Sequence, residues 1–346
     1  MKKRFLSLFL AGLALAAWTA QAQNTTTQSA VEEAALALTS AEETPEQVAM
    51  PKYWTATLVT NINFGQTFLS HWTAGGYNNF SLSGTVDGRL DFNRDKLTGS
   101  THLVMDYGFL YSADKPILQK VKDRIYFESK WGYSTPVKNL AYSATLDFRT
   151  QFHNNYDYKT PVSDGIEEPT VQDWLEARVL KSGFLAPAYI NLGVGALWTP
   201  APWFSLNVAP LSGGAVIVNI PQLRYTYGMP LVSGSTTEYR NFRMEFGAQL
   251  KVDMGWVINQ NFSYTTQATV FWNYLTPKVV PRVNWDNKIT WKVARFFSLQ
   301  LSTYLIYDPL VMVKASQEGG ALDRPGIQFK EYFEVGFVYS LTTKKN

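Results

Sequence analysis

Long alternation of apolar and polar residues, with a period of two, is the feature that most constrains this fold. It is clearest at 140–153, 242–256, 262–274 and 282–293, where one set of alternate positions is mostly apolar and the other mostly charged, amide or hydroxyl. Successive side chains of a β-strand point to opposite faces, so the pattern predicts strands with one apolar and one polar face. Many of these segments reach the ~9–11 residues that span a bilayer, whereas soluble strands usually run about 5–6.

Weaker segments of the same kind bring the expected total to about twelve strands. They are 54–64, 80–92, 101–109, 123–133, 188–198, 204–220, 297–307 and 329–341. The segment 204–220 fits least well, because Pro210 and the Gly213–Gly214 pair interrupt it.

The expected connections alternate between short turns and long loops along the chain. The turns are 93–97, 136–139, 199–203, 259–261 and 295–296, and the loops are 65–77, 110–122, 154–183, 221–239, 275–281 and 308–328. A soluble sandwich gives no reason for this alternation, whereas a membrane barrel does. We therefore predict an all-β fold, a transmembrane antiparallel up-and-down β-barrel of about 12 strands with short periplasmic turns and long extracellular loops.

The first 22 residues have the order of a secretory signal peptide. Three basic residues at 2–4 precede an apolar run at 5–18, and a small-x-small motif ends at Ala22. The alternative is a membrane anchor, but the run is shorter than the roughly 20 residues that a membrane-spanning helix needs. We expect cleavage between Ala22 and Gln23, then an acidic flexible periplasmic leader at 23–51 and the barrel at 52–346, located in the bacterial outer membrane.

Composition excludes several classes of site and partner. The chain has no Cys, which excludes disulfides, thiolate metal sites and cysteine catalysis. Three of the 31 basic residues lie in the expected signal peptide, so 28 remain against 28 acidic residues. This balance gives no reason to expect a nucleic-acid partner. The expected partners are outer-membrane lipid, with small polar solutes or other envelope proteins.

Charged residues are dense on the faces expected to point inward, where charges are tolerable only in water or in mutual pairs. In a wide barrel they set solute preference across water. In a narrow barrel they pair into a network that fills the interior. Mixed signs favour the network, because a dedicated ion pore would show one dominant sign. The predicted network comprises Asp87, Arg89, Arg124, Glu128, Lys130, Asp147, Arg149, Arg243, Glu245, Lys251, Asp253, Lys292 and Glu334.

Catalytic and metal chemistry find little support. The three histidines, His71, His102 and His153, are scattered, and no nucleophile or zinc motif is present. The loop 154–183 is rich in Asp and Glu, but it lacks the Asp-x-Asp-x-Asp-Gly spacing of a calcium loop. We predict no catalytic residue, no metal ligand and no cofactor.

Several short motifs resemble those of a known family. They lie at 61–76, 123–133, 150–152 and 184–189. Together they resemble a Bacteroidota outer-membrane β-barrel family, the domain-of-unknown-function family 3078. The resemblance implies an outer-membrane location and assigns neither a substrate nor catalytic residues. Four residues, Gln66, Trp72, Gly75 and Gly76, are expected to shape a compact first loop, with the glycines at positive φ and the indole as a loop anchor or, alternatively, a sugar-stacking platform.

The expected function is that of a channel or porin-like conduit for small polar solutes. The alternative is a non-transporting barrel, structural or part of an envelope complex, with a salt-bridged interior. A third hypothesis, a barrel hydrolase, requires a His-centred group of residues at one height.

Overall fold

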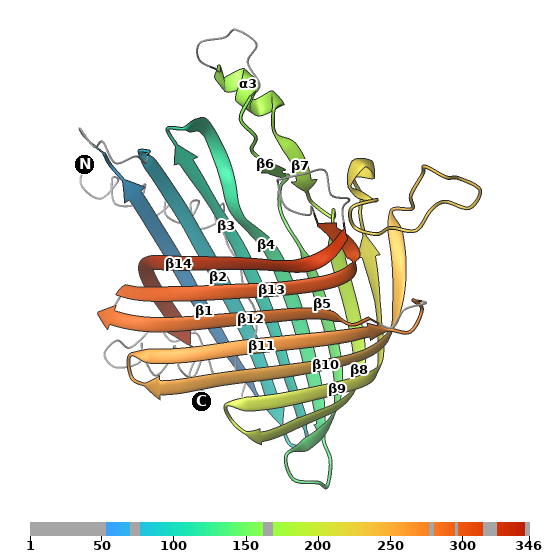
Figure 1. Cartoon of the computed structure of the whole chain (residues 1–346). Helices are drawn as coiled ribbons and strands as arrows, with labels where there is room; N and C mark the ends of the chain where they lie inside the picture. Colours follow the sequence, from blue (N-terminus) through green and yellow to red (C-terminus); the bar gives the residue numbers. More distant parts are fainter. Residues whose placement is uncertain are drawn as a thin grey trace, which may run out of the picture.

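The predicted closed antiparallel barrel is confirmed. The computed structural model describes residues 53–69, 77–161, 169–276, 280–294, 297–313 and 324–342. Twelve strands form one sheet that closes where β1 pairs with β14. In Figure 1 the strands of the front and back walls cross at a steep angle, as tilted strands of a barrel do. The barrel strands are β1 (Trp54–Thr67), β2 (Asn79–Arg94), β3 (Leu97–Ser112), β4 (Lys115–Ser134), β5 (Leu140–Thr150), β8 (Ala188–Ala201), β9 (Phe204–Ile217), β10 (Phe242–Asn259), β11 (Phe262–Asn273), β12 (Arg282–Ala294), β13 (Phe297–Val313) and β14 (Arg324–Thr342).

The connection between β5 and β8 carries its own small structure beyond the barrel rim (Figure 1). It contains the two-stranded sheet of β6 (Asn155–Asp157) and β7 (Val179–Ser182), with helix α3 (Val171–Glu176) between them. A capping box between Thr170 and Asp173 starts this helix. A 3-10 helix, η1 (Pro221–Leu223), lies between β9 and β10. Within the described ranges, no helix is long and apolar enough to cross a membrane.

The alternating sequence pattern gives the barrel a polar inside and an apolar outside. In β11, Ser263, Thr265 and Gln267 are buried, and these residues share one face of the strand. On β10 and β14, Met244 is 69% exposed and Phe333 is 66% exposed. Large apolar side chains therefore cover the outer surface, while hydroxyl, amide and charged groups fill the interior.

The expected long loop at 110–122 is wrong. β3 continues to Ser112 and β4 begins at Lys115, so the two strands form a tight hairpin that reaches beyond the rim (Figure 1). Ile117 is buried and Leu118 next to it is 60% exposed, which shows that the alternation persists into this region. The expected loop at 308–328 is also shorter, because β13 extends to Val313 and β14 begins at Arg324.

The residues expected to shape the first loop are only partly described. Gln66 lies in β1, paired with Phe80 of β2, and is thus a strand residue rather than a loop residue. Trp72, Gly75 and Gly76 lie outside the described residues, as do Ala22 and Gln23 of the expected cleavage site.

Strand β9 keeps its place in the sheet despite Pro210. Its neighbour β8 pairs Val194 with Leu211 and Ala196 with Val208, so a bulge forms between these pairs. A proline is tolerated there because the bulge interrupts the ladder of backbone hydrogen bonds. Gly195 lies opposite the bulge, where a Cβ atom would collide with the Val208 backbone.

Candidate functional site in the barrel lumen

A row of charged side chains on β4 is the centre of the interior. Lys122, Arg124, Glu128 and Lys130 are separated by even numbers of residues, so they share the inner face of one strand. The first three are buried. An isolated charge in such a place is costly, so the partners of this row determine what the lumen can do.

Two ion pairs join β4 to β10 across the lumen. Lys251 pairs with Glu128. Lys130 Nζ lies 3.1 Å from Asp253 Oδ2 and 3.3 Å from Glu128 Oε1. Strands β5, β8 and β9 separate β4 from β10 in the sheet, so these contacts connect distant walls of the barrel.

A third link runs from β4 in the other direction around the barrel. Lys122 pairs with Glu334 of β14. The same carboxylate accepts hydrogen bonds from Asn63 Nδ2 at 3.1 Å and from Ser83 Oγ at 3.2 Å. Because β4 is tied to both β10 and β14, these side chains cross-link the interior and narrow it.

A second charged cluster lies on β10, β12 and β13. Glu245 accepts from Arg243 at 3.0 Å and is 2.9 Å from Arg282. Asp308 lies 3.8 Å from the same Arg282 guanidinium. The segment between β9 and β10 folds onto this cluster, since Arg243 donates to the Gly228 carbonyl at 2.7 Å.

Tyr227 holds that segment against the rim of the barrel. Its hydroxyl donates to the Lys181 carbonyl at 3.0 Å. Burial raises the pKa of Tyr227 to about 12, so the hydroxyl stays protonated near neutral pH and keeps this bond. Leu223 and Met229 of the same segment are buried against Val216 and Val218.

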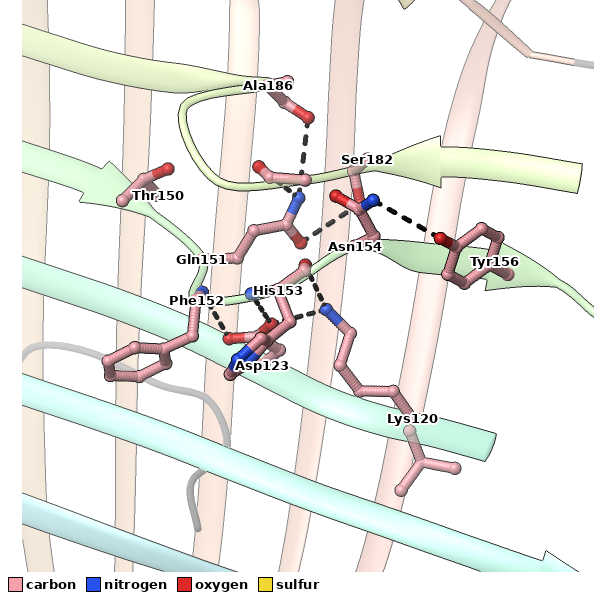
Figure 2. A network of polar contacts seen from close by, with 12 residues as sticks. Lys120, Asp123, Thr150, Gln151, Phe152, His153, Asn154, Tyr156, Ser182 and Ala186 are labelled. Carbon is pink, nitrogen blue, oxygen red and sulfur yellow. Dashed lines mark hydrogen bonds and ion pairs between the residues drawn. The ribbon is translucent and has the colours of Figure 1, made fainter. Parts of the chain in front are cut away.

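The loop-side rim is fastened by a polar network around Asp123 (Figure 2). Its carboxylate accepts the backbone N–H groups of Phe152 at 2.7 Å and His153 at 2.8 Å, and it pairs with Lys120. Gln151 donates to the Gly183 carbonyl at 2.9 Å. These bonds fix both ends of the excursion that carries β6, α3 and β7.

A cavity of about 500 Å³ lies between the ion pairs and the loop-side rim. Arg124 and Lys251 of the network line it, and so do Gln151, Ser182 and Tyr227 of the loop-side segments. Among the residues that the structure describes, its wall carries seven Lys and Arg side chains against four Asp side chains. The cavity is therefore basic, although the expected mature chain is neutral.

The residues of the charged network predicted from the sequence all lie on barrel strands. Glu128, Lys130, Lys251 and Asp253 meet in one cluster, and Glu334 joins it through β4. Arg243 meets Glu245 in the second cluster.

The other predicted residues lie apart from these clusters. Arg89 pairs with Asp91 at 2.9 Å near the short-turn rim. Asp147 accepts from Asn191 at 2.7 Å. Arg149 lines the cavity, and Lys292 lies near the short-turn end of β12.

Sequence reasoning missed three residues that belong to these clusters. Lys122 and Asp308 were assigned to loops, because the strands that carry them extend farther than the alternation alone suggested. Arg282 is the first residue of β12. The signal that identifies all three is their parity, which continues the inward face of the neighbouring strand residues.

The two histidines that the structure describes lie apart. His102 lies in the lumen with Nε2 2.7 Å from the Asp87 Oδ1, and His153 packs edge-on against Tyr107 at the rim. His71 lies outside the described residues. Among the residues that the structure describes, no group of three or more His, Asp or Glu side chains is placed to hold a metal ion.

One family matches part of the chain. Residues 64–156, from the end of β1 to β6, match the family described as "Protein of unknown function (DUF3078)". The predicted resemblance to a domain-of-unknown-function family is confirmed over this segment, and the Bacteroidota lineage stays a prediction. No curated protein matches the chain.

Solved barrels also resemble the chain in outline. An outer membrane channel from Pseudomonas putida F1 is 13% identical, with 87% of this chain and 100% of that chain covered and a TM-score of 0.36. The translocator domain of the autotransporter NalP from Neisseria meningitidis is 9% identical, with coverages of 89% and 94% and a TM-score of 0.33. The Pseudomonas putida toluene transporter TodX is 9% identical, with coverages of 94% and 96% and a TM-score of 0.33. With scores this low, the barrel architecture rests on the strand pairing of this chain and not on these similarities.

Proposed function

We propose that this chain is an outer-membrane β-barrel that conducts small polar solutes through a lumen narrowed by ion pairs. The observation that carries the proposal is the inverted distribution of side chains. Glu128 and Lys251 are buried inside, whereas Met244 and Phe333 face outward. In water this arrangement would expose apolar surface and bury charge, which is unfavourable. In a bilayer, a closed barrel places the apolar side chains against lipid and the charged ones in a polar interior.

Two groups of outward aromatic rings support insertion in a bilayer. Trp54, Phe92 and Trp131 pack near the short-turn rim, with ring centroids 4.9 Å and 5.9 Å apart. Phe64 and Phe80 pack at 5.1 Å near the loop rim. Along β2, from Phe80 to Phe92, about 3.3 Å per residue and a tilt of about 40° separate the groups by roughly 30 Å. This matches the hydrocarbon thickness of a bilayer, with aromatic girdles at both interfaces.

Conduction of small solutes is supported by the cavity on the loop side. A volume of about 500 Å³ accommodates a molecule of monosaccharide size. Beyond it, the pairs of Glu128 with Lys251 and Lys130 with Asp253 form the constriction. A small hydrated solute can pass such a site only where it competes with the ion pairs, so we expect a low conductance.

A second candidate is a non-transporting barrel, structural or part of an envelope complex. The same cross-lumen ion pairs favour it, because buried pairs with good geometry can fill a narrow barrel completely. The two candidates differ only in whether the constriction opens to solutes.

Conductance of the refolded chain 23–346 in planar bilayers distinguishes them. We expect small steps from the wild type, larger steps from the Glu128→Gln/Lys251→Met double variant, and wild-type steps from an Arg178→Gln control beyond the rim. Absence of conductance from a folded wild type would overturn the conduit in favour of the second candidate, whether or not the double variant conducts. Export is part of the same proposal, and a mature mass that begins at Gln23 in outer-membrane fractions would support it.

A further inference from the structure

The basic wall of the lumen cavity combines guanidinium groups with an aromatic ring. Arg124 on β4 and Arg149 on β5 both face Tyr126, with their Cζ atoms 4.9 Å and 5.3 Å from the ring centroid. Arg149 lies directly opposite Tyr126 in the β4–β5 pairing. The two arginines are thus diagonal neighbours on one inner face, and all three residues line the cavity.

Arg149 differs from the other basic residues of this wall in its partners. Among the described residues, Arg149 has no ion pair within 4.0 Å and no hydrogen bond; it faces the Tyr126 ring, and the buried Asp147 and Asp286 carboxylates act on its charge from farther away. The nearest acid on its own strand, Asp147, is engaged by Asn191 at 2.7 Å. Arg282, by comparison, pairs with both Glu245 and Asp308. Arg149 therefore lines the cavity with a guanidinium whose five N–H donors form no hydrogen bond with the described residues.

A second pair of cations extends the same wall. The amines of Lys122 and Lys330 each lie 4.6 Å from the centre of the Tyr332 ring, and both lysines line the cavity. Glu334 compensates Lys122. Positive charge therefore exceeds negative charge around the cavity, and a planar guanidinium fork is available within it.

We propose that this cavity binds a small solute through an oxyanion group, carboxylate or phosphate, held by Arg149 with Arg124 beside it. Guanidinium groups bind both kinds of oxyanion through two parallel hydrogen bonds, and a site shielded from bulk water strengthens them. Tyr189 and Phe271 also line the cavity and offer apolar surface to the body of the solute. The inference deepens the proposed function by naming its solute class, and it rests on that function only for the claim that the bound solute then passes.

Isothermal titration of the refolded chain 23–346 in detergent tests the site with four sugars of similar size. Glucuronate and glucose 6-phosphate present the two oxyanions, glucose is neutral and glucosamine is cationic. We expect at least one of the two anions to bind about tenfold or more tightly than glucose, with glucosamine the weakest. Preference between the two anions identifies the oxyanion. The proposal would be overturned if glucose or glucosamine bound as tightly as the two anions, or if neither anion bound.

Variants assign the effect to Arg149. Arg149→Gln should weaken anion binding about tenfold or more, and Arg149→Lys, which keeps the charge but loses the planar fork, should weaken it less. Arg178→Gln is the matched control, because Arg178 contacts the Tyr156 ring at 4.1 Å outside the cavity. Unchanged anion affinity in a folded Arg149→Gln barrel would refute the role of this residue. If Arg149→Gln does not fold, unchanged anion affinity in Arg149→Lys would refute it instead.

Conductance separates this inference from the proposed function. Anion binding by a barrel that does not conduct would support the site and refute the conduit. If the barrel conducts but does not bind either anion, and its conductance does not change when they are added, the conduit would be supported and the site refuted.

Discussion

Removal of the Lys251 charge should lower the free energy of unfolding of the barrel, because Lys251 forms a buried ion pair with Glu128. The side chains of Lys251 and Glu128 are 7% and 4% exposed, so their pair is buried. Loss of one member of a buried pair costs about 3–5 kcal/mol, because the other charge is left in a poor environment. In Lys251→Met, Glu128 keeps Lys130 at 3.3 Å, which it shares with Asp253. We therefore expect the lower end of the range, a loss of about 3 kcal/mol.

Denaturant unfolding of the barrel in lipid vesicles measures this free energy. The double variant Glu128→Gln/Lys251→Met should lose less than the sum of the two single variants, by about 2 kcal/mol or more, because it removes both charges of one pair. Losses that add to within about 0.5 kcal/mol would refute the cross-lumen pair. Lys181→Met is the control, since Lys181 and Asp157 pair at 3.5 Å with more than 40% of each side chain exposed, and its cost should be below about 1 kcal/mol.

Three further predictions concern the segments outside the lumen. Asp123→Asn should accelerate hydrogen exchange of the Phe152 amide about tenfold or more, because a neutral amide replaces the charged carboxylate that accepts this N–H at 2.7 Å and the hydrogen bond becomes weaker. Unchanged protection of this amide would contradict the prediction. Hydrogen bonds from Thr170 hold the pKa of Asp173 below its ordinary value, so the ionised carboxylate stabilises α3 above a pH of about 4. This stabilisation is lost as the pH falls through the lower pKa of the folded state. NMR titration should show a higher pKa of Asp173 in Thr170→Val, and an unaltered titration curve would disprove the link. Gly228→Ala should loosen the segment between β9 and β10, because φ of +62° costs an L-residue about 1–2 kcal/mol and the added Cβ meets the Leu310 backbone; equal protease resistance would argue against it.

The sequence was sufficient to predict the strands of the barrel, because each strand carries its own evidence. In β11 the alternation of buried Ser263, Thr265 and Gln267 with outward residues is local, and it needs no knowledge of the partner strand. Even β9 was predictable, since Pro210 is accommodated in a bulge without ending the strand. The number of strands followed from this local pattern.

Strand ends and lumen contacts could not be predicted in the same way. The β3–β4 turn at Ala113 and Asp114 has no Gly or Asn to mark it, so the hairpin resembled a loop. The contact between Lys130 and Asp253 joins residues 123 positions apart on strands that are not neighbours. Such a contact depends on strand tilt and stagger in the closed barrel, which no single strand encodes.

The mixed signs of the inward charges were interpreted as evidence against a selective pore, and the structure changes that argument. What matters for a solute is which charges remain after pairing, because a paired acid and base present little net field. At the constriction, Lys251 and Glu128 compensate each other, whereas Arg149 faces the cavity with no ion pair among the described residues. Stability and solute preference should therefore separate. Lys251→Met should lower the unfolding free energy more than Arg149→Gln does, whereas Arg149→Gln should lower anion affinity more than Lys251→Met does.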